Sequence, residues 1–121
     1  MQLTRSQWDT LEVLASNAMH EIDKRDGGCL LSEIDHPWLV RKYLSLFWKG
    51  MAALGVARRE TQTQRQARLA FLSFLFRRKI ETVKDLNHAE VVAFLSICIS
   101  DATHGDMVEI WRNFGGTTKS D

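Results

Sequence analysis

The chain of 121 residues carries a net charge of +1, and 45% of its residues are hydrophobic. This length fits one domain, and folding at this size buries roughly two-thirds of the surface of the unfolded chain, so a core forms without disulfide staples. No segment approaches the ~18–20 uninterrupted apolar residues that cross a bilayer, and no signal peptide is recognisable. We therefore expect a cytoplasmic protein without membrane contact, in which Cys29 and Cys98 are reduced thiols.

The small net charge hides a strong segregation along the chain. Residues 1–40 carry three basic and seven acidic side chains (−4), residues 41–80 carry ten basic side chains and one acidic (+9), and residues 81–121 carry three and seven (−4). Two interpretations stay open. Acidic outer helices neutralise the basic middle third within the molecule, or the middle third is a surface for phosphates.

The first predicted helix starts directly after Thr4. Thr4 is its expected N-cap with Gln7 three residues on, and Leu3 is placed to pack against Trp8. A pair of glycines, Gly27–Gly28, ends the helix. The apolar side chains at spacings of three and four predict one stripe toward the core, made of Trp8, Leu11, Ala15, Ala18 and Ile22.

The second predicted helix runs from about Trp38 to Leu54, with Pro37 tolerated at its start and Gly55 as its C-cap. Its apolar side chains recur with helical spacing, which indicates one broad buried side. That side consists of Val40, Tyr43, Leu44, Phe47, Met51 and Leu54, and the remaining surface carries Arg41, Lys42 and Lys49.

The third predicted helix, capped by Thr61 or Thr63, contains the most apolar run of the chain, residues 67–80. Its apolar side chains fall on two opposite faces, so we expect it to be the central and most buried helix, with Phe71 and Phe74 in the core. One narrow polar strip between these faces holds Arg65, Arg68 and Lys79. The C-terminal end of this helix carries three cations, Arg77, Arg78 and Lys79, which stabilise the negative helix terminus without any ligand.

A fourth, mostly buried helix is predicted from about His88 to Ala102, with Asn87 as N-cap and Glu90 at the third helical position. A short fifth helix follows Gly105 and carries Met107, Ile110, Trp111 and Phe114. The predicted fold is all-α: one domain over residues 1–114, a bundle of four main helices plus a short C-terminal helix, followed by a frayed tail over residues 115–121.

The segment KIETVKDLNHAEV, residues 79–91, resembles part of the GemA-like regulatory proteins of Mu-type phages. There a basic helix end, a Ser or Thr, an Asp-Leu pair and a capped helix start follow one another, and the preceding TQTQRQARLAFLSFLF is similar to a Gln-containing helix of those proteins. The resemblance covers about a third of the chain and rests on Ile80, Thr82, Lys84, Asp85, Leu86 and Glu90. It implies a mobile-element protein that acts near DNA or its replication machinery.

Catalytic signatures are absent from the sequence: there is no Gly-rich phosphate loop, HExxH or CxxC. We therefore predict a non-enzymatic protein without a cofactor. His20 and Asp23 have the spacing of metal ligands, but a solvated polar face is the favoured interpretation. For Trp8, Trp38 and Trp111, core packing is favoured over stacking on single-stranded bases.

Two classes of function follow. The first is a nucleic-acid-binding module, or a small subunit of a nucleoprotein complex, that contacts phosphates without reading bases. Its candidate residues are Arg58, Arg59, Arg65, Arg68, Arg77, Arg78, Lys79 and Lys84. The second is a protein-binding adaptor or inhibitor, which uses the charge pattern to dock a partner or a second copy of itself. If the cations are neutralised internally, the expected partners are Glu12, Glu21 or Glu109.

Overall fold

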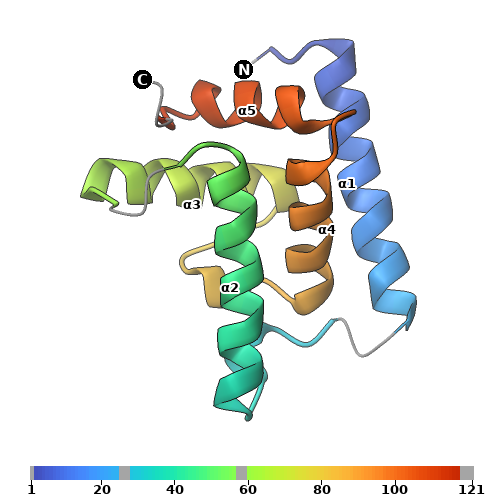
Figure 1. The fold of residues 1–121 in the computed structure, drawn as a ribbon, viewed down its shortest axis with the longest axis vertical. Helices are drawn as coiled ribbons and strands as arrows, with labels where there is room; N and C mark the ends of the chain where they lie inside the picture. The colour runs from blue at the N-terminus through green and yellow to red at the C-terminus, as the bar shows by residue number, and fades with distance from the viewer. Residues whose placement is uncertain (1, 25–27, 57–59, 118–121) are drawn as a thin grey trace.

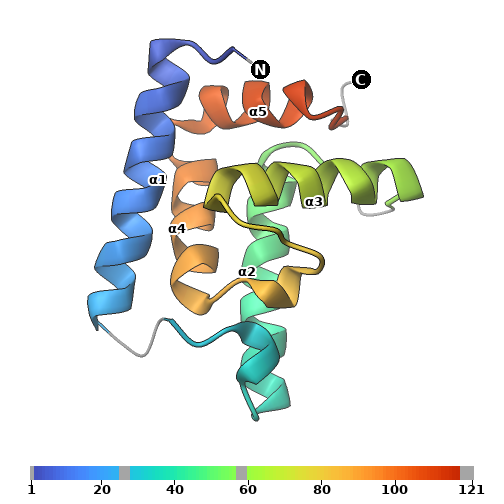
Figure 2. The same ribbon diagram turned by 180° about the vertical axis from the view of Figure 1, so that it is seen from behind.

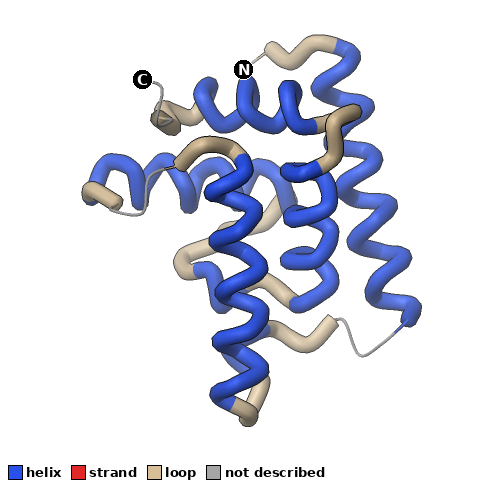
Figure 3. The backbone as a smooth tube through the Cα atoms, in the orientation of Figure 1, coloured by secondary structure: helices blue, strands red, loops and turns tan. Residues whose placement is uncertain are grey.

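Five α-helices account for most of the chain in the computed structural model, which describes residues 2–24, 28–56 and 60–117. The described residues contain no β-strand (Figure 3). The predicted all-α, single-domain bundle is therefore confirmed. The helices are α1 (Arg5–Lys24), α2 (Pro37–Ala53), α3 (Gln62–Phe76), α4 (His88–Ile99) and α5 (His104–Asn113), with short 3-10 turns η1 (Leu31–Glu33) and η2 (Val83–Asp85).

The central helix is α4, which lies between α1 and α2 and also packs against α5 (Figure 1). Eight of its 12 residues are buried, and the ring of Phe94 stacks on Phe47 of α2 with 5.4 Å between centroids. Our prediction that the third helix occupies this place is wrong. The physical reason is that α4 carries a single charged side chain, Glu90, so other helices can surround it.

The third helix, α3, crosses the bundle behind α2 and α4 in Figure 1 and in front of them in Figure 2. Phe71 is completely buried and lies 5.2 Å from Trp111 of α5 between ring centroids, whereas Phe74 is only partly buried. The helix ends at Phe76, so Arg78 and Lys79, which we expected in its last turn, lie beyond it, because Arg77 adopts a left-handed conformation with φ 55°.

Local hydrogen bonds form the predicted helix starts. Thr4 and Gln7 exchange backbone-to-side-chain hydrogen bonds of 3.0 and 3.1 Å. Asn87 and Glu90 do the same at the start of α4, with distances of 2.9 and 2.8 Å, and Thr61 caps α3. These reciprocal bonds satisfy amide groups that have no partner inside the helix.

The last described residues, 115–117, are held against α3 and α5, although we expected them to be frayed. Thr117 donates its backbone N–H and its hydroxyl to Oε1 of Gln64, at 3.1 and 3.0 Å, and its carbonyl accepts from the indole of Trp111 at 3.2 Å. The domain therefore extends at least to Thr117. The rest of the predicted tail, 118–121, lies outside the described residues.

Both cysteines are free, with Cys98 buried in α4 and Cys29 partly buried before η1. Burial raises the pKa of the Cys98 thiol. Within the described ranges, no helix taken alone has the length and apolar character needed to cross a membrane. In the described residues, only α4 and α5 taken together have that length and apolar character, and they are bent by 107° relative to one another.

Candidate functional site

The predicted cationic strip of the third helix does not exist as a surface, because Arg68 lies inside the molecule. Only 6% of Arg68 is exposed, and its guanidinium donates to both carboxylate oxygens of Glu60, at 2.7 and 3.0 Å. It also lies 5.1 Å from the ring centroid of Trp48 on α2. Arg68 is therefore removed from the candidate phosphate ligands, and Lys79, which follows the end of α3, does not share a helix face with Arg65.

Arg78 is also paired within the fold. Its guanidinium makes a two-point contact with the carboxylate of Glu90 and donates to the carbonyl oxygen of Asp85 at 2.6 Å. Glu90 is 7% exposed, and its hydrogen bond raises the pKa of Arg78. The pair connects the end of α3 to the start of α4, which is a structural role.

Arg68 and Arg78 are thus neutralised within the molecule, but not by acidic outer helices as we expected, because Glu60 belongs to the middle third and Glu90 to the central helix α4. The carboxylates involved are Glu60 and Glu90, and an exposed pair joins Lys79 to Glu81 at 3.2 Å. We expected other glutamates in this role, Glu12, Glu21 or Glu109, and Glu109 instead accepts a hydrogen bond from Gln7 at 2.7 Å.

Three predicted cations, Arg65, Arg77 and Lys84, are exposed and make no ion pair with other described residues. Arg65 and Arg77 lie at opposite ends of α3, about 18 Å apart along a helix of 1.5 Å rise per residue. The structure therefore does not gather these cations into one surface. Arg58 and Arg59 lie outside the described residues.

A cationic and aromatic surface occurs instead on α2, and we call it the α2 face. At about 100° per residue, its side chains fall within an arc of roughly 120° on the outer side of the helix. The helix contains no acidic residue, and its three cations make no ion pair with any described residue. The α2 face consists of Trp38, Arg41, Lys42, Trp48 and Lys49, all of them exposed.

The exposure of Trp38 on the α2 face and of Trp8 on α1 contradicts our preference for core packing of these two rings. Trp38 is 59% exposed and Trp48 is 39% exposed, and Trp8 on α1 is 44% exposed, whereas Trp111 is completely buried as predicted. The exposure of Trp38 could have been predicted from its angular position on a helical wheel of α2. Trp38 lies opposite the fully buried Phe47, on the side of the lysines, so a count of apolar spacing alone assigned it to the wrong side.

A hollow of about 480 Å³ connects the α2 face to η2. Arg41 from α2 and Lys84 from η2 both line it, together with the apolar side chains of Ile34 and Leu44 and the carboxylate of Asp35. Among the predicted site residues, the buried Arg68 contacts Trp48 of the α2 face, and Lys84 is an exposed one that lies across this hollow from Arg41.

No group of three or more His, Cys, Asp or Glu side chains that could hold a metal occurs in the described part of the chain. The side chain of Asp23, one half of the spaced pair His20 and Asp23, is not among those described.

Comparison with protein-family models, with curated proteins and with solved structures finds no match to this chain. The resemblance of residues 79–91 to GemA-like proteins stays a prediction.

Proposed function

We propose that this protein is a small non-enzymatic module that binds the backbone of single-stranded nucleic acid through the α2 face. The observation that supports the proposal is the combination of three cations and two exposed indole rings on one helix without an acidic residue. Cations bind phosphates of any sequence, and indole rings stack on any base. In line with the resemblance, we further propose that the protein belongs to a mobile element and acts beside its DNA.

The dimensions of the α2 face suit a short stretch of single strand. Arg41 and Lys49 are eight residues apart, or about 12 Å along the helix axis. This distance corresponds to roughly three or four phosphates at ~3.4 Å per stacked nucleotide. Trp38 lies one turn before Arg41, so a base next to the bound phosphates can reach its exposed ring, and stacking contributes about 1–3 kcal/mol per base.

The test is a titration of labelled single- and double-stranded DNA and RNA at two salt concentrations. We expect tightest binding to the single strands. The triple variant Arg41→Ala, Lys42→Ala, Lys49→Ala should lose most of the affinity and flatten the salt dependence by about two units of slope, at ~0.7 per phosphate contact. Trp38→Ala should weaken binding by about fivefold or more.

The matched control removes three exposed cations that lie outside both the α2 face and the groove: Arg5→Ala, Arg65→Ala and Lys79→Ala. This variant has the same net charge as the α2 variant, and it should retain most of the affinity. Equal losses in the two variants would mean that binding depends on overall charge and not on the α2 face. Absence of binding to all four nucleic acids at low salt would refute the proposed function.

The second candidate function is the protein-binding adaptor or inhibitor. An apolar groove between α1 and α3 favours it, because exposed apolar hollows of this kind are typical of interaction sites. If the protein binds none of the nucleic acids, this candidate takes precedence.

A further inference from the structure

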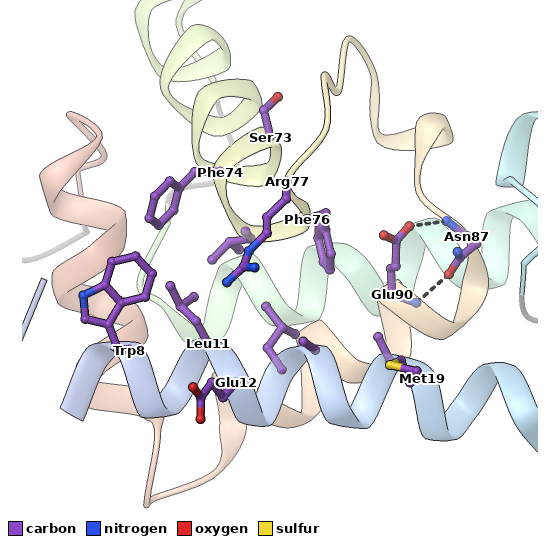
Figure 4. Close-up of a pocket in the computed structure, with 14 residues that line it drawn as sticks. Trp8, Leu11, Glu12, Met19, Ser73, Phe74, Phe76, Arg77, Asn87 and Glu90 are labelled. Carbon is purple, nitrogen blue, oxygen red and sulfur yellow. Dashed lines mark hydrogen bonds between the residues drawn. The ribbon is translucent and has the colours of Figure 1, made fainter. Parts of the chain in front are cut away.

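A groove of about 830 Å³ opens between α1, the C-terminal end of α3 and the start of α4 (Figure 4). Its walls are mainly apolar. Trp8 and Met19 come from α1, and Phe74 and Phe76 come from α3. Met19 is 68% exposed and Trp8 is 44% exposed, so the groove leaves large apolar side chains in water. Such a surface favours association with another apolar surface.

One strip of α1 forms a wall of this groove. Trp8, Glu12, Ala15 and Met19 recur at spacings of four, three and four residues, which places them within an arc of roughly 60°. All four are exposed, whereas the buried side of α1, represented by Leu14, lies on a different side of the helix. Of the apolar stripe that we predicted toward the core, Leu11 and Ala18 are buried, whereas the prediction is wrong for Trp8 and Ala15. The side chain of Ile22 is not among those described. A second strip about 16 Å long faces outward.

Two charges of opposite sign stand on the two rims of the groove. Glu12 projects from α1, and Arg77 extends from the end of α3 toward α1 (Figure 4). Both are exposed, and neither makes an ion pair with another described residue. The other carboxylate of the groove, that of Glu90, is already bound by Arg78. The occupant of the groove must therefore present an apolar strip with a positive group opposite Glu12 and a negative group opposite Arg77.

We propose that a second copy of this chain occupies the groove and forms a twofold-symmetric dimer in which the two α1 helices run antiparallel. In a contact of this symmetry each residue pair occurs twice. Antiparallel pairing of the strip places Trp8 against Met19 of the second copy and Glu12 beside its Ala15, whose small side chain permits close approach. Glu12 of each copy then lies near Arg77 of the other. The symmetric contact therefore contains two ion pairs, one on each rim of the groove.

The dimer does not depend on nucleic-acid binding, because no residue of α2 lines the groove. Both copies keep their α2 faces accessible, and two faces on one particle would bind a long strand more tightly than one.

The test is the molecular mass in solution by sedimentation equilibrium over a wide range of concentration. The wild type should approach twice the chain mass of 13.9 kDa. Glu12→Arg alone places two cations at each rim contact, and Arg77→Glu alone places two anions there. Each single variant should therefore weaken the dimer by about tenfold or more, because like charges across an interface repel.

The decisive step is to mix the two single variants. In the mixture, Arg at position 12 of one chain faces Glu at position 77 of the other, and the unchanged Arg77 of the first faces Glu12 of the second. A heterodimer should therefore form, and the double variant Glu12→Arg, Arg77→Glu should form a homodimer again. Lys49→Glu, which reverses an exposed charge outside the groove, is the matched control and should dimerise like the wild type.

Circular dichroism of every variant establishes that it is folded. A wild type that stays monomeric at all concentrations overturns the proposal. The proposal also fails if both single variants remain dimeric, which would indicate a different interface, or if the folded variants stay monomeric when mixed. Loss of nucleic-acid binding has no bearing on these outcomes.

Discussion

Truncation of Phe71 to alanine is expected to destabilise the fold by about 3–5 kcal/mol. The side chain is completely buried, and its ring lies 5.2 Å from Trp111 of α5 and 6.2 Å from Phe94 of α4 between centroids. One ring thus joins three helices. The cavity left by its removal would have walls of large aromatic side chains on separate helices, which relax only partly into the space.

The matched control is Phe74→Ala, which removes the same side chain three residues further along the same helix. Phe74 is partly exposed at the groove, with Phe114 at 5.2 Å and Trp8 at 6.5 Å between ring centroids. Phe74 is only partly buried and packs at the edge of the core, so we expect a smaller loss of about 1–2 kcal/mol, below that for the completely buried Phe71.

Urea unfolding followed by far-ultraviolet circular dichroism measures both changes, with the slope of the free energy against denaturant as a check on two-state behaviour. If the two variants lose equal stability, the two positions do not differ in burial as the structure describes. A silent Phe71→Ala would show that α3 does not pack on α4 and α5 through this ring.

Arg78→Ala should cost about 2 kcal/mol in the same urea assay, since it leaves the buried carboxylate of Glu90 without its cation, whereas Lys79→Ala should cost ~0–1 kcal/mol because its pair with Glu81 is exposed. Equal effects of the two changes would contradict a structural role for Arg78. In native protein, Ellman's reagent should react quickly with Cys29 and with Cys98 only after unfolding. Because burial raises the pKa of Cys98 above its ordinary value of 9.0, the thiol contributes stability that is fully present below pH 9 and is lost at higher pH, as the unfolded thiol ionises first. Cys98→Ala should therefore weaken the alkaline decline of stability, and an unchanged pH profile would argue against this linkage.

The starts of α1 and α4 could be predicted from the sequence because each depends on residues three positions apart, whereas α5 begins at His104, before Gly105, where we expected it to follow that glycine. Thr4 with Gln7, and Asn87 with Glu90, form their reciprocal hydrogen bonds whatever the rest of the chain does. The helix ends were predicted less well. The end of α3 depends on the left-handed conformation of Arg77, which a non-glycine residue adopts too rarely for the sequence to indicate it.

From the sequence, the candidate site could be predicted only as a basic surface in the middle third of the chain, without the residues that form it. The sequence places ten basic residues in the middle third, but it does not say which of them meet a carboxylate. Arg68 contacts Glu60 in the segment directly before α3, and it contacts Trp48, 20 positions away, only because α2 and α3 come together at this point. The exposed cations Lys42 and Lys49 on α2 make no ion pair with a described residue, which the sequence does not indicate either.

By itself, then, the sequence determined the helical class, the starts of α1 and α4 and the segregation of charge, since these follow from periodicity, from contacts within one turn of helix and from composition. Only the tertiary structure decided that α4 is central, that Arg68 is internal and that Trp38 and Met19 are exposed. Periodicity shows which side chains share a helix face. Whether that face meets another helix or water depends on long-range packing.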